Sequence, residues 1–205
     1  MYPSERATAG LVLAHGAGAG QASQFMVQAA RGLASRGVTT ATFDFPYMEA
    51  GRKVPDRAPI LEEAWRKAVA EMRTRIDDLP LFIGGKSMGG RIASQVASQG
   101  SATPLHGLVF LGYPLHPPGK PEQRRDAHLP AIKEPMLFVQ GTRDAFGTAA
   151  EIQALLPRLQ RATLREINGG DHSFKVPGGK AAQEPVFEDI LHTVASFIRA
   201  ASGRA

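Results

Sequence analysis

Ser87 has the strongest chemical signature in this sequence, because it lies in the run Gly85-Lys86-Ser87-Met88-Gly89-Gly90. This G-x-S-x-G pattern follows the apolar residues 80–84 directly and precedes a segment with helical spacing. In such a strand–turn–helix the serine stands on a sharp turn, and the flanking glycines let strand and helix approach closely. The pattern predicts a nucleophilic serine. The alternative is a glycine-rich turn with a structural serine.

A serine hydroxyl is a poor nucleophile until a base takes its proton, and that base needs an orienting acid. Asp144 follows the apolar residues 135–139, and His172 follows residues 162–167. The chain order Ser, Asp, His, with each residue in the loop after a later strand, is typical of catalytic triads built on a parallel sheet. The alternatives are a helix N-cap for Asp144 and a solvated loop histidine for His172. Asp171 adjoins His172, but chain neighbours rarely point at one another, so Asp144 is preferred as the acid.

An acyl-transfer site also needs backbone N–H groups that stabilise negative charge on the carbonyl oxygen. The Met88 N–H, directly after the serine, is one candidate donor. The glycine-rich loop His15-Gly16-Ala17-Gly18-Ala19-Gly20 offers the other. We assign this second donor to Ala17, with Gly18 as the alternative.

Two phosphate-binding motifs fit these glycines poorly. A P-loop ending in Gly85-Lys86-Ser87 would need a glycine at position 80, which is Pro80. A dinucleotide loop requires G-x-G-x-x-G, whereas residues 16–20 are spaced G-x-G-x-G. The histidines show no metal-binding spacing either, so we expect no metal and no cofactor.

These candidate residues must be positioned by alternating strands and helices. Apolar runs predict strands over residues 10–15, 38–43, 80–84, 105–111, 135–139 and 162–167. Helical spacing predicts helices over residues 23–35, 60–76, 87–99, 148–156 and 185–200, with a long loop over 44–59. This alternation predicts a three-layer α/β fold, with a parallel sheet covered on both faces. We expect strand order 2-1-3-4-5-6 and one domain over residues 1–205.

The composition is that of an ordinary globular protein, with 43% hydrophobic and 21% charged residues. The chain has no cysteine, which excludes disulfides and thiolate nucleophiles and fits a cytoplasmic location. Residues 1–10 contain no apolar stretch and no apolar run is long enough to cross a bilayer, so we expect no signal peptide and no membrane contact. The net charge is +5, but the basic residues are scattered and form no nucleic-acid-binding stripe. No oligomeric state follows from the sequence.

Together these motifs resemble the α/β-hydrolases, and more narrowly a small dienelactone-hydrolase-like branch. That branch includes the testis-expressed hydrolase-like proteins and a subunit of a histone acetyltransferase complex. The resemblance runs through HGAGAG, FDFPYMEAGRK, GGKSMGGR, GTRDAFG and GGDHSF. It implies the triad Ser87, Asp144 and His172, and it implies that the loop FDFPYMEAGRK edges the site. Dienelactone hydrolases use a cysteine nucleophile, which this chain lacks, so their specific reaction is not expected.

The chain departs from the usual fold of this family in two places. Because the first predicted strand begins at residue 10, we expect the opening antiparallel hairpin to be absent, and residues 112–134 leave room for a loop but not for a helical cap.

The expected activity is hydrolysis of an ester or related acyl bond of a small substrate, through a serine acyl-enzyme. The alternative is a non-catalytic scaffold that keeps the fold for protein binding. Candidate substrate contacts are Gly18, Tyr47, Arg52 and Arg91. Because the loops at the strand ends carry more basic than acidic residues, we hypothesise an anionic substrate; the alternative is that these side chains only solvate the rim.

Overall fold

The computed structural model describes residues 1–100 and 104–203. Its six strands form one sheet in the order β2-β1-β3-β4-β5-β6, and every neighbouring pair is parallel. The strands are β1 (Ala9–Ala14), β2 (Val38–Phe43), β3 (Leu81–Lys86), β4 (Gly107–Leu111), β5 (Met136–Gly141) and β6 (Ala162–Ile167). The predicted strand order is therefore confirmed. Residues 101–103 and 204–205, which the single-domain prediction includes, lie outside the described part of the chain.

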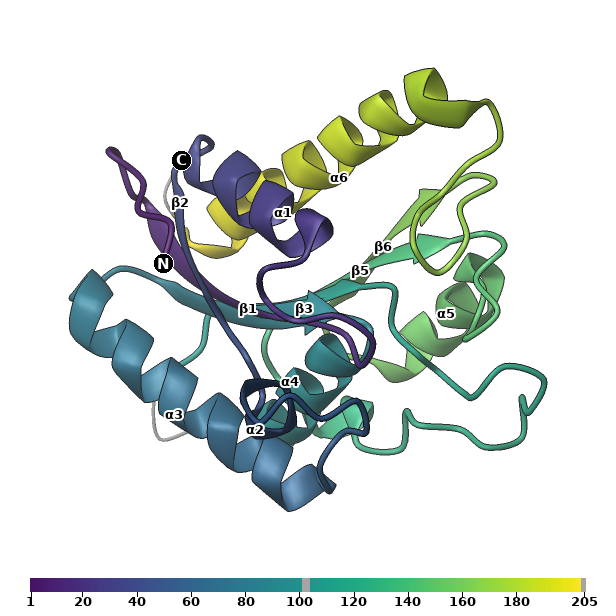
Figure 1. Ribbon diagram of the computed structural model, residues 1–205, viewed down its shortest axis with the longest axis horizontal. Coiled ribbons are helices and arrows are strands. Elements are labelled where there is room, and N and C mark those ends of the chain that lie inside the picture. The colour runs from purple at the N-terminus through teal and green to yellow at the C-terminus, as the bar shows by residue number, and fades with distance from the viewer. Residues whose placement is uncertain (101–103, 204–205) are drawn as a thin grey trace.

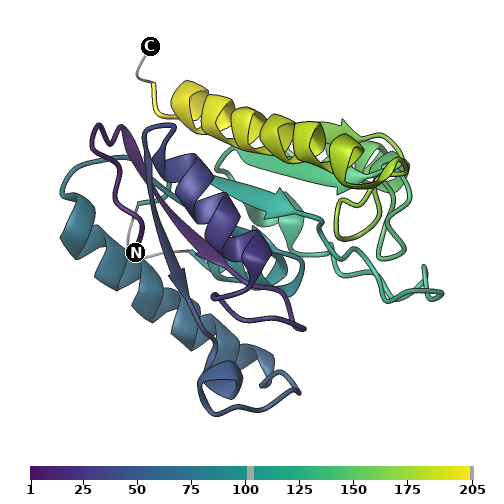
Figure 2. The same ribbon diagram turned by 45° about the horizontal axis from the view of Figure 1, so that its top comes forward.

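Helices cover both faces of this sheet (Figure 1). On one face lie α1 (Gln24–Ala34) and α6 (Gly179–Ala201); on the other lie α3 (Ala58–Ile76), α4 (Met88–Ser98) and α5 (Ala149–Leu155). The view in Figure 2 shows α6 running along the outside of the sheet beside α1. The three-layer α/β arrangement is the predicted fold class.

The central strands supply side chains to both layers, as expected for a sheet buried on both faces. Along β1, Leu11 and Leu13 pack with α1 and α6, whereas Val12 and Ala14 belong to the core on the α3 and α4 side. All four are 0% exposed. The strand that carries Ser87 at its end, β3, pairs with β1 on one side and β4 on the other. The candidate serine is thus mounted on a central, fully paired strand.

Two element predictions were wrong in detail. The expected loop over residues 44–59 contains a short helix, α2 (Pro46–Glu49), which begins with a proline at its first position. The last helix begins at Gly179 rather than at Pro185, which lies inside it. A side chain supports this earlier turn: the Gln183 amide donates to the Phe174 carbonyl at 2.8 Å and its oxygen accepts from the Val176 N–H at 3.2 Å.

The two predicted departures from the larger fold concern the start of the chain and the segment after β4. In the described residues no strand precedes β1, and Tyr2 makes one antiparallel bridge with Thr40 of β2. Residues 112–134 form a loop with one short 3-10 turn, η1 (Leu129–Ala131), and no cap. Over residues 1–100 and 104–203, no helix combines the length and apolar character that a membrane crossing requires.

Candidate active site

Ser87 stands on a strained turn between β3 and α4, with φ 51° and ψ −118°. A positive φ is unfavourable for a residue with a Cβ, and such strain is typical of functional turns. The flanking glycines make the turn possible. A Cβ on Gly85 would lie 2.6 Å from the carbonyl oxygen of Ala14, and a Cβ on Gly89 would lie 2.5 Å from the same atom. The sequence thus folds here as a nucleophile elbow.

The structure brings the three predicted side chains into one hydrogen-bonded line. Ser87 Oγ lies 2.8 Å from His172 Nε2, and His172 Nδ1 lies 2.8 Å from Asp144 Oδ2. With the imidazole proton on Nδ1, His172 donates to Asp144 and its Nε2 accepts from the serine hydroxyl. This geometry allows His172 to take the serine proton.

The carboxylate of Asp144 is fully buried and held by donors on both oxygens. Oδ1 accepts from the Phe146 N–H at 2.8 Å, and Oδ2 accepts from the Gln140 amide at 2.9 Å as well as from His172. Gln140, which the sequence analysis did not single out, also donates to the Gly147 carbonyl at 2.6 Å. These bonds fix the direction in which Asp144 faces His172.

The helix that follows Asp144 has its own cap. The Thr148 hydroxyl accepts from the Glu151 N–H at 3.3 Å, and the Glu151 carboxylate accepts from the Thr148 N–H at 2.8 Å, a capping box. Asp171 is used locally as well, because its Oδ1 accepts from the N–H groups of Ser173 and Lys175. Thr148 therefore fills the N-cap role that was the alternative for Asp144. Asp171, the other acid that could have oriented His172, is held in its own turn.

A buried lysine ties the histidine loop to the elbow. The Lys86 ammonium donates to the His172 carbonyl oxygen at 2.6 Å and stands 5.3 Å from the centre of the Phe174 ring. A Cβ on Gly112, at φ 71°, would lie 3.1 Å from that ammonium. Burial lowers the pKa of Lys86 to about 8, against the opposing attraction of Asp144 and Asp171. Lys86 therefore bridges β3 and the loop after β6 immediately beside the serine.

The two predicted oxyanion donors lie at the same place. Within the described residues, neither the Ala17 N–H nor the Met88 N–H donates a hydrogen bond to the chain. A Cβ on Gly16 would lie 3.4 Å from Ser87 Cβ, so the loop after β1 passes directly beside the nucleophile. Met88 also heads α4, whose N-terminus attracts negative charge.

The four candidate substrate contacts divide into one that lines a cavity beside Ser87 and three that do not. Arg91 lines it. Tyr47 is completely buried and its hydroxyl donates to the Ala17 carbonyl at 3.1 Å, so it holds the loop instead of facing a substrate. Arg52 is exposed and pairs with Asp56 at 2.8 Å, and Gly18 is exposed and does not line the cavity.

The cavity beside Ser87 has a volume of about 250 Å³. Ala17, Ser87 and Met88 line it, so the predicted nucleophile and both predicted oxyanion donors face one space. The charged residues that line the cavity are Asp56, Arg91 and Arg125. The roles of Lys86 and Arg125 carried no local sequence signal, because Lys86 binds a loop far along the chain and Arg125 joins a cavity lined by several other segments. Asp56 contacts Arg52 and Gln140 contacts Asp144, each four residues away, a spacing that is too common to indicate a site.

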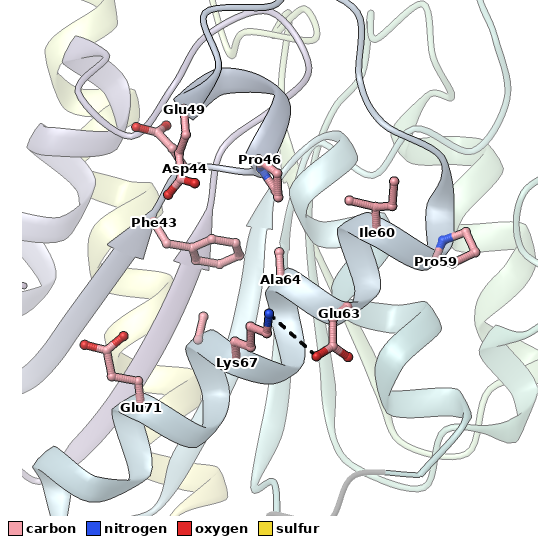
Figure 3. Close-up of a pocket in the computed structure, with 11 residues that line it drawn as sticks. Phe43, Asp44, Pro46, Glu49, Pro59, Ile60, Glu63, Ala64, Lys67 and Glu71 are labelled. Atoms are coloured by element: carbon pink, nitrogen blue, oxygen red, sulfur yellow. Dashed lines mark ion pairs between the residues drawn. The ribbon is translucent and has the colours of Figure 1, made fainter.

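A second hollow of about 500 Å³ lies between the end of β2, α2 and one face of α3 (Figure 3). Its lining includes Asp44, Glu49, Glu63 and Glu71, and Lys67 pairs with Glu63 at 4.0 Å. Ser87, His172 and Asp144 do not line this hollow. In the described part of the chain, this hollow included, no group of three or more histidine and acidic side chains is placed to hold a metal ion.

Several solved structures share this fold. Dienelactone hydrolase from Anabaena variabilis superposes with a TM-score of 0.75 at 20% identity, over 97% of this chain and 88% of that one. Est1E from Butyrivibrio proteoclasticus, with ferulic acid bound, gives 0.69 at 16% identity, over 93% and 91%. XC6422 from Xanthomonas campestris, an a/b serine hydrolase without lid, gives 0.67 at 17% identity, over 98% and 84%. At these identities the likeness establishes the fold alone.

The sequence itself matches the model of the alpha/beta hydrolase domain over residues 7–200, which is nearly its whole length. The match spans the elbow, the acid after β5 and the histidine after β6. Sequence and fold therefore agree that this chain belongs to the alpha/beta hydrolase domain family.

Proposed function

We propose that the protein is a serine hydrolase that cleaves an ester or related acyl bond of a small substrate. The observation that carries the proposal is the line Ser87–His172–Asp144, with both contacts at 2.8 Å, on a strained elbow. Beside it are two backbone N–H groups that donate to no other described residue. A protein that uses this fold only for binding has no need for all of these groups at one point.

In the proposed mechanism, Ser87 Oγ attacks the acyl carbon while its proton passes to His172 Nε2. The N–H groups of Ala17 and Met88 hold the negative carbonyl oxygen of the tetrahedral intermediate. When the intermediate collapses, the bond to the leaving oxygen breaks and His172 gives that oxygen its proton. Water then attacks the acyl-enzyme, His172 accepts its proton, and the acid leaves as Ser87 recovers its own.

The related structures support a hydrolytic function. Esterases, serine hydrolases and a dienelactone hydrolase share the fold. The finer assignment to the small branch with the testis-expressed proteins, the cytoplasmic location and the absence of nucleic-acid and membrane partners belong to the same proposal. The competing function is a non-catalytic scaffold.

A fluorophosphonate probe tests the proposal directly, because it labels an activated serine. We expect labelling of the wild-type protein and turnover of p-nitrophenyl acetate. Ser87→Ala should abolish both without loss of the folded state, because it removes one hydroxyl and keeps the Cβ. Ser98→Ala is a matched control on the last turn of α4, remote from the elbow. Unchanged turnover in Ser87→Ala would contradict Ser87 as the nucleophile, and a wild type that is neither labelled nor active would favour the scaffold.

A further inference from the structure

Two unpaired polar atoms distinguish the cavity beside Ser87. Among the described residues, the buried side-chain polar atoms without a hydrogen-bond partner are Asp56 Oδ2 and Arg91 Nε. Both side chains line this one cavity. Proteins rarely leave buried polar groups unpaired, since each lost bond costs about 1–3 kcal/mol. Two such atoms beside one space make it a place where a polar molecule, water or ligand, can complete the missing hydrogen bonds.

The positive charge of the cavity is also uncompensated. Arg91 and Arg125 both line it, and over residues 1–100 and 104–203 neither forms an ion pair. Arg124, by contrast, pairs with Asp126 at 2.9 Å. Burial, and then the charge of Arg125, lower the pKa of Arg91, as expected for two guanidinium groups that repel each other. An anion between them would relieve this repulsion.

Both arginines are attached to backbone that is itself fixed. The Arg91 N–H donates to the Ser87 carbonyl at 3.1 Å, which places Arg91 one helical turn beyond the nucleophile. The Arg125 N–H donates to Leu115 O at 2.9 Å, and its carbonyl accepts from the Tyr113 hydroxyl at 2.8 Å. Tyr113 is fully buried. The backbone that carries each arginine beside the cavity is therefore held in place by hydrogen bonds.

Asp56 adds a hydrogen-bond acceptor to the same cavity. Its Oδ1 pairs with Arg52 at 2.8 Å, which balances its charge, while Oδ2 has no partner. A carboxylate oxygen accepts hydrogen bonds only, so it would take a donor such as a hydroxyl or an amide N–H. The volume of about 250 Å³ holds roughly eight groups of the size of water.

Resting on the proposed function, we propose that this cavity selects short acyl substrates that carry a carboxylate, bound by Arg91 and Arg125. Arginine forks match planar carboxylates with two parallel hydrogen bonds. A hydroxyl or amide on the same substrate donates to Asp56. The carboxylate stands a few bonds from the scissile carbonyl, because Ser87 lines the same small space.

Matched ester pairs test the charge requirement on either side of the scissile bond. One pair is 3-acetoxybenzoate and 3-acetoxybenzamide, and the other is methyl hydrogen glutarate and methyl glutaramate. Within each pair only the anion changes to a neutral amide. We expect kcat/KM to favour the carboxylate by ~10- to 100-fold in at least one pair, the range of a charge-assisted hydrogen bond. No preference in either pair would overturn the inference.

Variants then test the residues. In Arg91→Met and Arg125→Met the ratio of kcat/KM within the preferred pair should fall towards one. Arg125→Lys, which keeps the charge but not the fork, should retain part of it. Arg57→Gln removes a charge from an exposed residue beside the cavity and should leave the ratio intact. A ratio that survives in both methionine variants would refute the assignment.

Fluorophosphonate labelling of every variant separates the two proposals. A labelled, folded protein that hydrolyses neutral esters without preferring the anion retains the serine-hydrolase function and loses only the carboxylate pocket. A wild-type protein that is neither labelled nor active contradicts the function itself. Should a methionine variant fail to fold, Arg125→Lys and the wild-type pair ratios still decide the outcome.

Discussion

Asp144 and Asp171 are the two acids that could orient His172, and the structure gives them different neighbours. Asp144 Oδ2 lies 2.8 Å from His172 Nδ1, whereas Asp171 Oδ1 binds the N–H groups of its own turn. Asp144→Asn should lower kcat roughly 10,000-fold, because an amide cannot stabilise the imidazolium or its tautomer. Asp171→Asn keeps an oxygen acceptor and should cost far less. Steady-state turnover of one neutral ester compares them, and a larger loss in Asp171→Asn would reverse the assignment.

Lys86 gives the second prediction at this scale. Its pKa is lowered by burial from 10.5 to about 8 in the folded protein, so between these values the unfolded chain binds more protons. The contribution of Lys86 to the unfolding free energy should therefore rise with pH across about pH 8 to 10.5. It is lost over the same range as the pH is lowered, and it stays constant below about pH 8. Relative to Lys86→Met, the wild-type slope should approach ~1.4 kcal/mol per pH unit.

Denaturant unfolding at several pH values measures this difference, in which the other titrating groups cancel. Lys175→Met, at an exposed lysine in the loop after β6 that Lys86 contacts, is the control and should parallel the wild type. Parallel curves for Lys86→Met and the wild type would contradict a buried, proton-binding ammonium.

Single residues were predictable where their chemistry carried a local signal. Ser87 has its glycines, and Asp144 and His172 follow apolar strands. Gln140 and Arg125 have no such signal: Gln140 acts through its contact with a buried Asp144, and Arg125 reaches the cavity from a proline-rich loop. Tyr47 was assigned to the substrate from its loop, but its ring is in the core and only its hydroxyl reaches Ala17.

At the scale of elements, order was easier to predict than ends. Alternating strands and helices imply the parallel sheet, because each crossover must cover one of its faces. The early start of α6 depends on Gln183 binding the backbone of residues 174 and 176, a tertiary contact that overrides the usual preference of Pro185 for a helix start.

The missing cap leads to a prediction about substrate length. Residues 112–134 form a loop with one 3-10 turn, and within the described chain no helix from this segment covers Ser87. Without a lid there is no apolar wall to bury a long acyl chain. We expect kcat/KM to fall from p-nitrophenyl acetate and butyrate to decanoate, with no rate increase at the micelle concentration of the long ester. A preference for decanoate would contradict it.

For the molecule as a whole, the two cores share the same strands. Leu11 and Leu13 face α1 and α6, and Val12 and Ala14 face α3 and α4, so both cores pack against the same strand β1. Trp65, fully buried on the α3 side, is the only tryptophan and reports on that layer alone. The prediction of one domain over residues 1–205 therefore becomes a prediction of one cooperative transition.

A substitution in the opposite layer tests this cooperativity. Leu191 of α6 is 3% exposed, and Leu191→Ala should lower the unfolding free energy by ~2–5 kcal/mol through lost burial and a cavity. Although Leu191 and Trp65 belong to different cores, the Trp65 fluorescence midpoint should move to lower denaturant by the same amount as the far-UV circular dichroism midpoint. Lys67→Ala, at an exposed position on α3, is the control. It should change the unfolding free energy obtained from either signal by no more than about 0.5 kcal/mol. Equal shifts are expected because a shared sheet transmits the loss of either core to the other. If Leu191→Ala shifted the dichroism but left the Trp65 transition in place, the two layers would unfold separately and the chain would not be one cooperative unit.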